Sequence, residues 1–431
     1  MTRASVGFAV GVFVISLAPD CLPAGDWPSW RGPAGTGVAS ADANPPVHWD
    51  AEQGIGWKVE LPGPGNSSPI VVGDKVFITQ FAPESRDRLL LAYDLETGTE
   101  LWRHAERVEK DEWTHPSNPL CNATPASDGK VVVAFLGQAG LVCCDLEGKL
   151  LWKRQWGSPE HLFGGGPSPV IVDDRCIVTF GPGRTQFYAA LELATGEDIW
   201  RIDMPRIDAP NPLEGPNAPP LPKETDLKDP FGSWATPLLV ATETGHELAI
   251  AMPGEVRGVD IATGKTLWSC DGPEAQVLCS PTFAAGHVII QSGVSLAVQP
   301  GGEGDVSETG VQWRVENDPA RIGSPLVVGN RLYGITMNGV VDCRRLDDGT
   351  EVWKERLREP GGRGGSWTSL VASGDRIYAL TQSGTTFVFK AGDEFEQLAT
   401  NTLGEATNAT PAIAEGVMII RTNGHLWCVR G

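Results

Sequence analysis

Two adjacent cysteines, Cys143 and Cys144, are the residues whose types and spacing most directly suggest chemistry. In some redox enzymes such a vicinal pair closes into a strained disulfide ring beside a cofactor. The pair lies in "GLVCCDLEGKLLW", between an apolar run and a polar turn. Consecutive residues of a β-strand point to opposite faces, so these sulfurs could bond only if the strand were locally distorted. The element that contains the pair therefore decides its role.

Other catalytic patterns are missing from the sequence. The seven histidines show no His-x-His or His-Glu-x-x-His spacing, so zinc hydrolysis lacks ligands. The glycine-rich stretches "GPGRT" and "GGRGGS" lack the Lys-Ser/Thr of a phosphate-binding loop, and no Gly-x-Ser-x-Gly nucleophile elbow occurs. The sequence therefore predicts no catalytic residue and no metal ligand.

The charge of the chain limits its partners. The 34 basic and 54 acidic residues give a formal charge of −20, which argues against nucleic acid as a partner.

The N-terminus indicates the compartment. Arg3 precedes the apolar run "VGFAVGVFVISLA", and "CLPA" offers cleavage after Ala24. This order is typical of a signal peptide, and the run is too short to span a bilayer comfortably. We therefore expect residues 1–24 to be a signal peptide, no membrane span, and a periplasmic or extracellular protein.

One phrase recurs along the chain: a small residue, then Ser or Thr, then Pro, then an apolar run. Its copies start at Ser67, Ala123, Pro167, Ala235, Cys279, Gly323, Thr368 and Ala409. They are about 41 to 68 residues apart, most often near 44, and only the seventh has Leu370 in place of the Pro. Self-similarity at this period indicates a repeat architecture.

Each copy continues through turn residues into further alternating strands. A second phrase, as in "AYDLETGTELW", places an Asp-x-x-Thr-Gly turn before a Trp. Four strands in about 44 residues is the period of a propeller blade. The sequence therefore predicts an all-β chain, an eight-bladed β-propeller with four-stranded antiparallel blades. The eighth copy reaches Gly431 without a fourth strand, and "GIGWKVEL" has the form of that strand, so we expect the N-terminal strand to close the ring.

The phrase "AYDLETGTELW" resembles the tryptophan-docking motif of the quinoprotein alcohol dehydrogenase-like (PQQ-repeat) propellers, and "GVDIATGKTLW" and "ALELATGEDIW" are near matches. The resemblance covers roughly residues 49–431, and "WPSWRGPAGTGV" is similar to the N-terminal strap of the secreted members. It implies that each motif Trp packs between blades, with Leu398 as the substitute in blade 7. The implied docking residues are Trp57, Trp102, Trp152, Trp200, Trp268, Trp313 and Trp353.

The repeat places the cysteines in alignment columns. Cys143 aligns with Ala92, Ala190 and Gly258 in a column of small residues, and Cys144 falls in the next, apolar column. This favours ordinary strand over a vicinal disulfide, because free Cys behaves as a small hydrophobe. Cys121 and Cys270 are expected in loops. A disulfide between Cys270 and Cys279 in an oxidising compartment remains open, since a sequence does not show the Cα separation.

Residues three positions before the repeat Pro are expected to form a ring at one mouth of the channel. In blade order they are Asn66, Asn122, Gly166, Trp234, Leu278, Ile322, Trp367 and Asn408. One side of this ring is amide and the other apolar, which would suit a flat ligand with polar edges. The candidate ligand-binding residues are Asn66, Asn122, Trp234, Trp367 and Asn408. The alternative, which the pattern favours, is that Asn supplies turn geometry and Trp covers the channel end.

The expected organisation is a signal peptide (1–24), a strap (25–48) and a propeller (49–431) interrupted by a Pro-rich insertion (204–233). A second insertion, "HAERVEKDEWTHPSNPLC", separates blades 1 and 2. Long loops on a rigid scaffold are where propellers usually carry function.

We interpret the chain as a non-enzymatic extracytoplasmic binding or scaffold module, expected to be a monomer that binds a protein or small ligand at a propeller face. It resembles the non-enzymatic PQQ-repeat proteins, among them the propeller lipoprotein of the outer-membrane barrel-assembly machinery. The alternative is a PQQ-dependent oxidoreductase similar to the alcohol dehydrogenases, with PQQ held over calcium. No catalytic or calcium-binding position of those enzymes can be placed on this chain by motif, so no cofactor is predicted.

Overall fold

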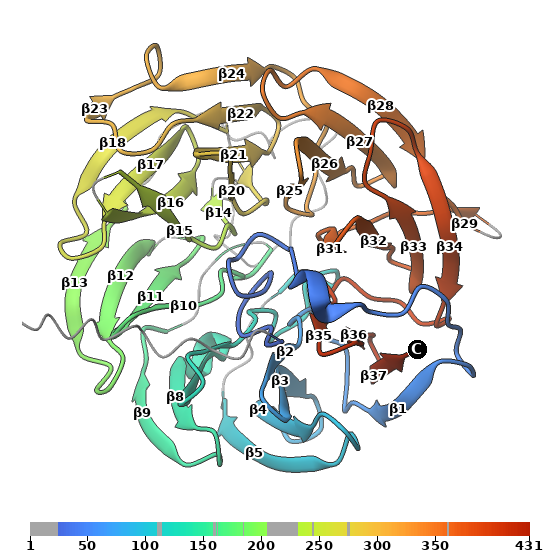
Figure 1. Ribbon diagram of the computed structural model, residues 1–431. Coiled ribbons are helices and arrows are strands. Elements are labelled where there is room, and N and C mark those ends of the chain that lie inside the picture. The colour runs from blue at the N-terminus through green and yellow to red at the C-terminus, as the bar shows by residue number, and fades with distance from the viewer. Residues whose placement is uncertain are drawn as a thin grey trace, which may run out of the picture.

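Four-stranded sheets surround a central channel like the blades of a propeller (Figure 1). The computed structural model describes residues 25–109, 114–157, 161, 163–183, 185–204, 232–243, 245–273, 276–359 and 362–431. The predicted signal peptide (1–24) and most of the Pro-rich insertion (205–231) lie outside the described residues. Among the described residues, no helix has the length and apolar character needed to cross a membrane.

The first four blades follow one another along the chain. Blade 1 contains β2 (Ile70–Val72), β3 (Lys75–Ala82), β4 (Asp87–Asp94) and β5 (Glu100–Arg107). Blade 2 contains β6 (Ala126–Ser127), β7 (Val131–Phe135), β8 (Leu141–Asp145) and β9 (Leu150–Arg154). Blade 3 contains β10 (Val170–Val172), β11 (Arg175–Phe180), β12 (Phe187–Glu192) and β13 (Asp198–Asp203). Blade 4 contains β15 (Leu238–Thr242), β16 (Gly245–Met252), β17 (Glu255–Asp260) and β18 (Thr266–Asp271), with β23 (Gly304–Asp305) added in parallel outside β18.

The remaining blades complete the circle. Blade 5 contains β20 (Thr282–Ala284), β21 (His287–Gln291), β22 (Ser295–Val298) and β24 (Val311–Val315). Blade 6 contains β25 (Leu326–Val328), β26 (Arg331–Ile335), β27 (Val340–Arg345) and β28 (Glu351–Arg356). Blade 7 contains β31 (Val371–Ser373), β32 (Arg376–Leu380), β33 (Thr385–Lys390) and β34 (Glu396–Thr402). Blade 8 contains β35 (Ala412–Ala414), β36 (Val417–Arg421), β37 (His425–Arg430) and β1 (Ile55–Glu60).

Short elements lie between the blades. These are β14 (Gly232–Ser233) paired with β19 (Gln276–Val277), β29 (Arg358–Glu359) paired with β30 (Gly362–Arg363), and the 3₁₀ turns η1 (Ala41–Ala43) and η2 (Gly137–Ala139).

The ring is closed by strands from the two parts of the chain farthest apart in sequence. β1 pairs antiparallel with β37, with Trp57 opposite Cys428 (Figure 1). This pairing removes the free sheet edge that an incomplete eighth blade would expose. The prediction of an eight-bladed, all-β propeller closed by an N-terminal strand is confirmed.

The recurring Thr-Gly turns connect the third and fourth strands of a blade and also receive the Trp of the preceding blade. In blade 1 the Asp94 carboxylate accepts from the Thr97 N–H at 2.8 Å, and Gly98 has φ 70°. A Cβ on Gly98 would lie 2.6 Å from the Trp57 ring. Glycine is therefore required twice, for the backbone conformation and for the packed ring.

Six of the implied docking tryptophans donate their indole N–H to a main-chain oxygen of the next blade. The pairs are Trp57–Leu95, Trp102–Leu146, Trp152–Leu193, Trp200–Ile261, Trp313–Leu346 and Trp353–Gly392. Trp268 differs: it donates to Glu247 Oε1 at 2.6 Å within its own blade and is fully buried beneath the chain around β23. Blade 5 lacks the Thr-Gly turn in the usual place, which explains the exception.

Blade 7 corrects one expectation. The residue opposite Val388 in the Trp position is Ala399, and Leu398 is the extra residue of a bulge. The same bulge precedes Trp102 at Leu101. The register position assigned to Leu398 was therefore wrong by one residue, because sequence alignment does not separate a bulged residue from its paired neighbour. Leu398 nevertheless packs against the core that blade 7 shares with blade 8.

The cysteine pair is ordinary strand, as the repeat alignment indicated. Cys143 and Cys144 are consecutive residues of β8, and both are buried free thiols. Cys143 packs in the core between blades 2 and 3, whereas Cys144 packs in the core between blades 1 and 2. Burial raises the pKa of each thiol to about 12, so neither is a thiolate at neutral pH.

Candidate binding surfaces at the two ends of the channel

The channel has two distinct ends. At one end, here called the rim end, the chain enters the innermost strand of each blade. At the other, the strap end, tight turns lead from the first strand to the second, and residues 25–48 cross this face as the strap (Figure 1). The eight predicted rim residues, from Asn66 to Asn408, are all half-buried at the rim end.

Two of the candidate ligand-binding residues hold a loop of the protein itself. Asn66 Nδ2 donates to Ser117 O at 3.1 Å and to Asn118 Oδ1 at 3.2 Å. Asn408 Nδ2 donates to the same Ser117 oxygen at 3.3 Å, and its own Oδ1 accepts from Gln382 at 2.9 Å. The insertion between blades 1 and 2 is therefore anchored across the rim by side chains from blades 1 and 8.

A second loop is held by Asn122 and Trp234. Asn122 Nδ2 donates to Gly165 O at 2.6 Å, and Trp234 Nε1 donates to Gly164 O at 2.9 Å. The His161 ring meets Trp234 edge-on, with centroids 4.9 Å apart, and Phe163 packs against the same indole at 6.2 Å. The loop before β10 is thus fastened to the rim by polar and aromatic contacts.

These contacts determine what the rim can do chemically. The amide nitrogens that could face a ligand already donate to carbonyl oxygens of the protein. Among the described residues, no group of three or more His, Cys, Asp or Glu side chains could hold a metal ion. Calcium is usually bound by several carboxylate and carbonyl oxygens. The described rim residues therefore do not fit PQQ held over calcium. Leu278, Ile322 and Trp367 give the other half of the rim an apolar character.

Just inside the rim, a closed ring of hydrogen bonds joins all eight blades. The residue before each repeat Pro, or before Leu370, donates its main-chain N–H to the hydroxyl of its counterpart in the next blade, at 2.9 to 3.1 Å. The members are Ser68, Thr124, Ser168, Thr236, Ser280, Ser324, Ser369 and Thr410. This ring explains why every copy has Ser or Thr at this position, for which the repeated phrase alone shows no partner.

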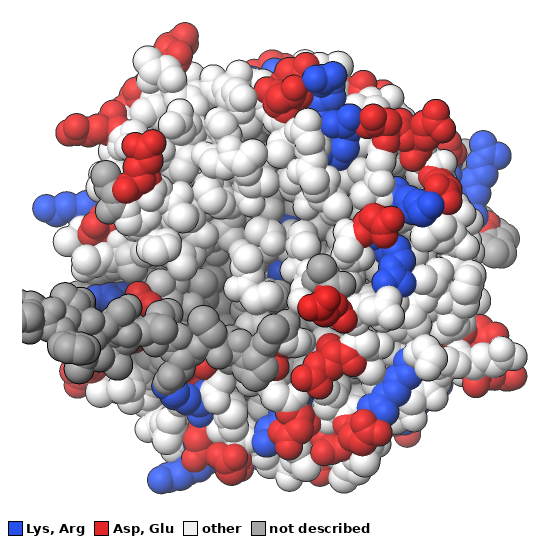
Figure 2. Space-filling model, in the orientation of Figure 1, with Lys and Arg blue, Asp and Glu red and all other residues white. Residues whose placement is uncertain are grey.

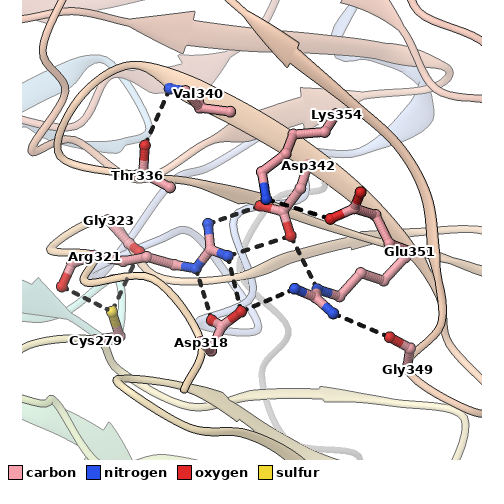
Figure 3. A network of polar contacts seen from close by, with 11 residues as sticks. Cys279, Asp318, Arg321, Gly323, Thr336, Val340, Asp342, Gly349, Glu351 and Lys354 are labelled. Carbon is pink, nitrogen blue, oxygen red and sulfur yellow. Dashed lines mark hydrogen bonds and ion pairs between the residues drawn. The ribbon is translucent and has the colours of Figure 1, made fainter. Parts of the chain in front are cut away.

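A buried network of four charges joins the loop before β25 to β27 in blade 6 (Figure 3). Arg321 lies 2.7 Å from Asp342 and 3.1 Å from Asp318. Arg344 lies 2.9 Å from each of the same two carboxylates. Burial opposes the charge on Arg321, but the carboxylates of Asp342 and Asp318 raise its pKa overall. Two positive and two negative groups are paired, so the network is neutral overall.

Two other buried arginines have neutral hydrogen-bond partners. Arg421 donates to Ser67 O at 3.1 Å, to Thr79 O at 2.9 Å and to Gln80 Oε1. Burial lowers the pKa of Arg421 to about 10. It therefore remains charged at neutral pH, held by carbonyl and amide oxygens at the rim end.

The strap carries the other arginine to the opposite end. Arg31 donates to Pro281 O at 3.3 Å, to Thr36 O at 2.7 Å and to Pro325 O. Burial lowers its pKa to about 9. The neighbouring Trp30 donates to the Ser280 hydroxyl at 3.1 Å. These side chains fasten the strap to blades 5 and 6.

The strap covers only part of this face. Between the strap residues Pro28–Gly35 and the innermost strands β6, β10, β15 and β20 lies a groove of about 610 Å³. Its volume is within the range of ligand-binding pockets. Sequence reasoning missed it, because it is formed by non-repetitive strap residues and by strands of four different blades.

Neither pairing considered for the thiols forms. Cys270 and Cys279 are both free, and Cys279 Sγ donates to Gly323 O at 3.4 Å. Cys270 lies in β18, opposite Val256, and not in the predicted loop. The sequence around a cysteine at the end of a strand does not show whether the residue belongs to the strand or to the loop that follows.

Comparison with known proteins places this geometry in a family. The profile of the family described as outer membrane protein assembly factor BamB matches residues 27–173 and 184–430. A comparison with curated proteins found no match.

Solved structures share the fold. The crystal structure of BamB from Moraxella catarrhalis is 13% identical, with 88% of this chain and 97% of that chain covered and a TM-score of 0.59. The computationally designed Ika8 protein is 12% identical, with 86% and 98% covered and a TM-score of 0.57. The quinohemoprotein alcohol dehydrogenase from Comamonas testosteroni is 14% identical, with 94% and 80% covered and a TM-score of 0.45, a similarity too low to bear on activity.

Proposed function

Since the chain belongs to the family described as outer membrane protein assembly factor BamB, we propose that it acts outside the cytoplasm as a non-enzymatic binding or scaffold module for a protein partner. The signal-peptide pattern of residues 1–24 supports export. The closed ring of blades supports a scaffold, because each blade packs between two neighbours and the loops can vary without loss of the fold.

One observation carries the proposal: the rim end is occupied by the protein's own loops. Asn66 and Asn408 share the Ser117 carbonyl, and Asn122 holds Gly165 O. A cofactor at this end would have to displace these loops and replace their hydrogen bonds. This supports a protein that presents its surface and does not use PQQ.

Calorimetry tests the cofactor alternative. The mature protein is titrated with PQQ in the presence of calcium chloride, beside an Asn66→Ala, Trp367→Ala double variant. We expect no saturable heat from either protein. Calcium-dependent binding by the wild type that is lost in the variant would contradict the proposal and make the dehydrogenase alternative the better one.

Cross-linking in the cells that produce the protein tests the partner. A photoreactive phenylalanine analogue is placed singly at Leu101, Leu151 and Phe283, on the outer strands and on the strap face. We expect at least one site to capture a defined protein, which then binds purified full-length chain with a measurable Kd. Purified candidates that fail to bind, or no capture at any site, would contradict a scaffold role.

A further inference from the structure

The innermost strand of every blade has a residue, at the same position of the repeat, whose main-chain groups face the channel. This residue lies two positions after the repeat Pro, or after Leu370. It is paired with the equivalent residue of the second strand in each blade, as Val71 is paired with Val76. In blade 1 the Val71 N–H and C=O bond to Trp27 of the strap, both at 2.9 Å. In an antiparallel hairpin such a residue directs both groups away from its own partner strand. We call these the edge residues.

The strap uses three of the eight edges. Besides Val71, the Ser127 N–H donates to Pro28 O at 2.9 Å in blade 2. In blade 7 the Ala372 N–H donates to Gly37 O at 2.9 Å, and its carbonyl accepts from Ala39 at 2.8 Å. The strap therefore binds mainly by adding peptide groups to open strand edges.

Three consecutive edges in the groove are different. Their edge residues are Ile171 in β10, Leu239 in β15 and Phe283 in β20. Ile171 and Phe283 are paired in the register of blade 1, and Leu239, opposite Leu248 in a hairpin with two more residue pairs, keeps the same alternation. Within the described part of the chain, no hydrogen bond reaches their channel-facing N–H or C=O groups. All three are half-buried and line the groove. A row of unpaired main-chain groups is a template for another chain.

The strap also shows how one chain can serve several blades. Consecutive residues, Trp27 and Pro28, bond to blades 1 and 2, so the chain runs across the blades and gives about one peptide unit to each edge. At Pro28 the strap turns away toward Trp30 and Arg31, which are held by blades 5 and 6. If a chain continued past Pro28 in the same direction, it would cross blades 3, 4 and 5, where the groove lies.

The groove walls indicate the kind of side chain that would fit. They include the half-buried Val170 and Trp30 and the exposed Ala241. Among the described lining residues, only Asp128, Lys130, Asp173 and His246 are charged or titratable. Figure 2 shows the charged side chains of this face mostly toward its circumference, with a largely uncharged area over β20 and β21. Uncharged side chains therefore suit the groove better than charged ones.

We propose that the groove binds an extended, uncharged polypeptide segment of a partner protein, which adds its main chain to the open edges of β10, β15 and β20. This proposal rests on the proposed scaffold function, for which it names the class of partner and the binding site. The main-chain bonds give affinity independent of sequence, and the apolar walls select side chains. The surface continues the interface that the strap already forms with blades 1 and 2.

The test uses immobilised full-length protein and three pools of capped eight-residue peptides. The first pool alternates Val, Ile, Leu or Phe with Ser, Thr, Asn or Gln. The second has Lys or Glu at the polar positions, and the third repeats the first with alternate peptide nitrogens methylated. We expect retention from the first pool only, since methylation removes donors from the peptide. The best retained peptide is then measured by fluorescence anisotropy.

Variants then locate the binding. Leu239→Pro removes the free N–H of the central edge without removing a ladder hydrogen bond, and Ala241→Arg places a charge in the groove with no change of backbone. Each should weaken the peptide at least tenfold. Val327→Pro makes the matched change in blade 6, outside the groove, and should leave the affinity unchanged. Thermal unfolding checks that all three variants fold.

Several outcomes would overturn the proposal. These are no retention from any pool, equal retention of the methylated pool, or unchanged affinity in both Leu239→Pro and Ala241→Arg. A native partner that is cross-linked from the outer strands and still binds both variants would leave the scaffold function standing without the groove. If no partner is captured at all, the proposed function itself fails.

Discussion

The rim end and the strap end of the channel are formed by the same eight innermost strands but are closed in different ways. At the rim end, loops that belong to the blade connections fold inward and are held by Asn66, Asn122 and Asn408. At the strap end, a separate segment crosses from outside the repeat and meets the edges of blades 1, 2 and 7. Two of the protein's own loops therefore occupy part of the rim, whereas the strap end keeps a groove over blades 3 to 5.

The buried arginines differ in their partners, although Arg421 at the rim end has neutral partners, as Arg31 has at the strap end. Near the rim, Arg321 and Arg344 are neutralised by Asp318 and Asp342. At the strap end, Arg31 is held by carbonyl oxygens alone. A charge paired with carboxylates is secured locally, whereas Arg31 depends on the strap staying in place. The difference teaches that an end closed by its own blades is part of the fold, and an end closed by a strap can serve as an interface.

The largest effect is expected at the rim end from Asp342→Asn. This variant leaves two buried arginines with one carboxylate, and breaking a buried charge pair typically costs about 3–5 kcal/mol. The free energy of unfolding in urea measures the loss. Asp347→Asn, which removes an exposed partner of Arg345, is the matched control and should change stability little. An equal loss of unfolding free energy in Asp342→Asn and Asp347→Asn would show that the buried ion pairs contribute no more than the exposed one.

A smaller effect is expected at the strap end from Arg31→Met. The variant leaves three carbonyl oxygens without their donor, so we expect a loss of about 1–3 kcal/mol. Hydrogen exchange should accelerate in the strap, at Gly37 and Ala39, and stay unchanged at the hydroxyl ring near the rim. Acceleration of both regions together would mean that the strap and the rim unfold as one unit.

Cys279, which follows the rim residue Leu278, links stability to pH. Burial raises its pKa to about 12, although Arg321 and Arg31 both act to lower it. A thiol with a raised pKa in the folded state stabilises the protein fully below its ordinary pKa, and this contribution is lost as the pH rises from about 9 to about 12. Relative to Cys279→Ala, wild type should therefore lose on the order of 1 kcal/mol by pH 10. Parallel pH profiles of the two proteins in urea unfolding would contradict this.

The smallest effect is expected from loosening a rim loop. Asn66→Ala and Asn408→Ala each remove a donor to Ser117 O, at a cost of about 0.5–1.5 kcal/mol. The loop should become more sensitive to limited proteolysis near Ser117, and the double variant more than either single one. Gln397→Ala, an exposed residue of blade 7, serves as the control. Unchanged cleavage in the double variant would show that the loop is held by other contacts.

Much of the fold could be predicted because each blade repeats the same local chemistry. The Ser/Thr-Pro entry, the Thr-Gly turn at Gly98 and the Trp that follows it specify strands, turns and spacing within one blade. The errors were local register errors. Leu398 was placed in the Trp position that Ala399 occupies, because a bulge adds a residue without a sequence marker.

The candidate sites were less predictable, because their contacts join distant residues. The rim residues were placed in a ring, but nothing local indicates that Asn66 and Asn408 share the Ser117 oxygen. The four charges near blade 6 were missed for the same reason. Arg321 and Asp342 lie on different elements and meet only after the strands of that blade pair.

The sequence by itself determined an eight-bladed propeller, its closure by the strand that contains Trp57, and the structural role of Cys143 and Cys144, since turn chemistry and alternation act over a few residues and recur eight times. Only the tertiary structure decided which end of the channel is partly occupied by the protein's own loops and which keeps open edges. That outcome depends on where the strap and the insertions settle, and these segments carry no repeat. Their positions are determined by single contacts such as Trp27 with Val71 and Arg31 with Pro281, between residues far apart in the chain.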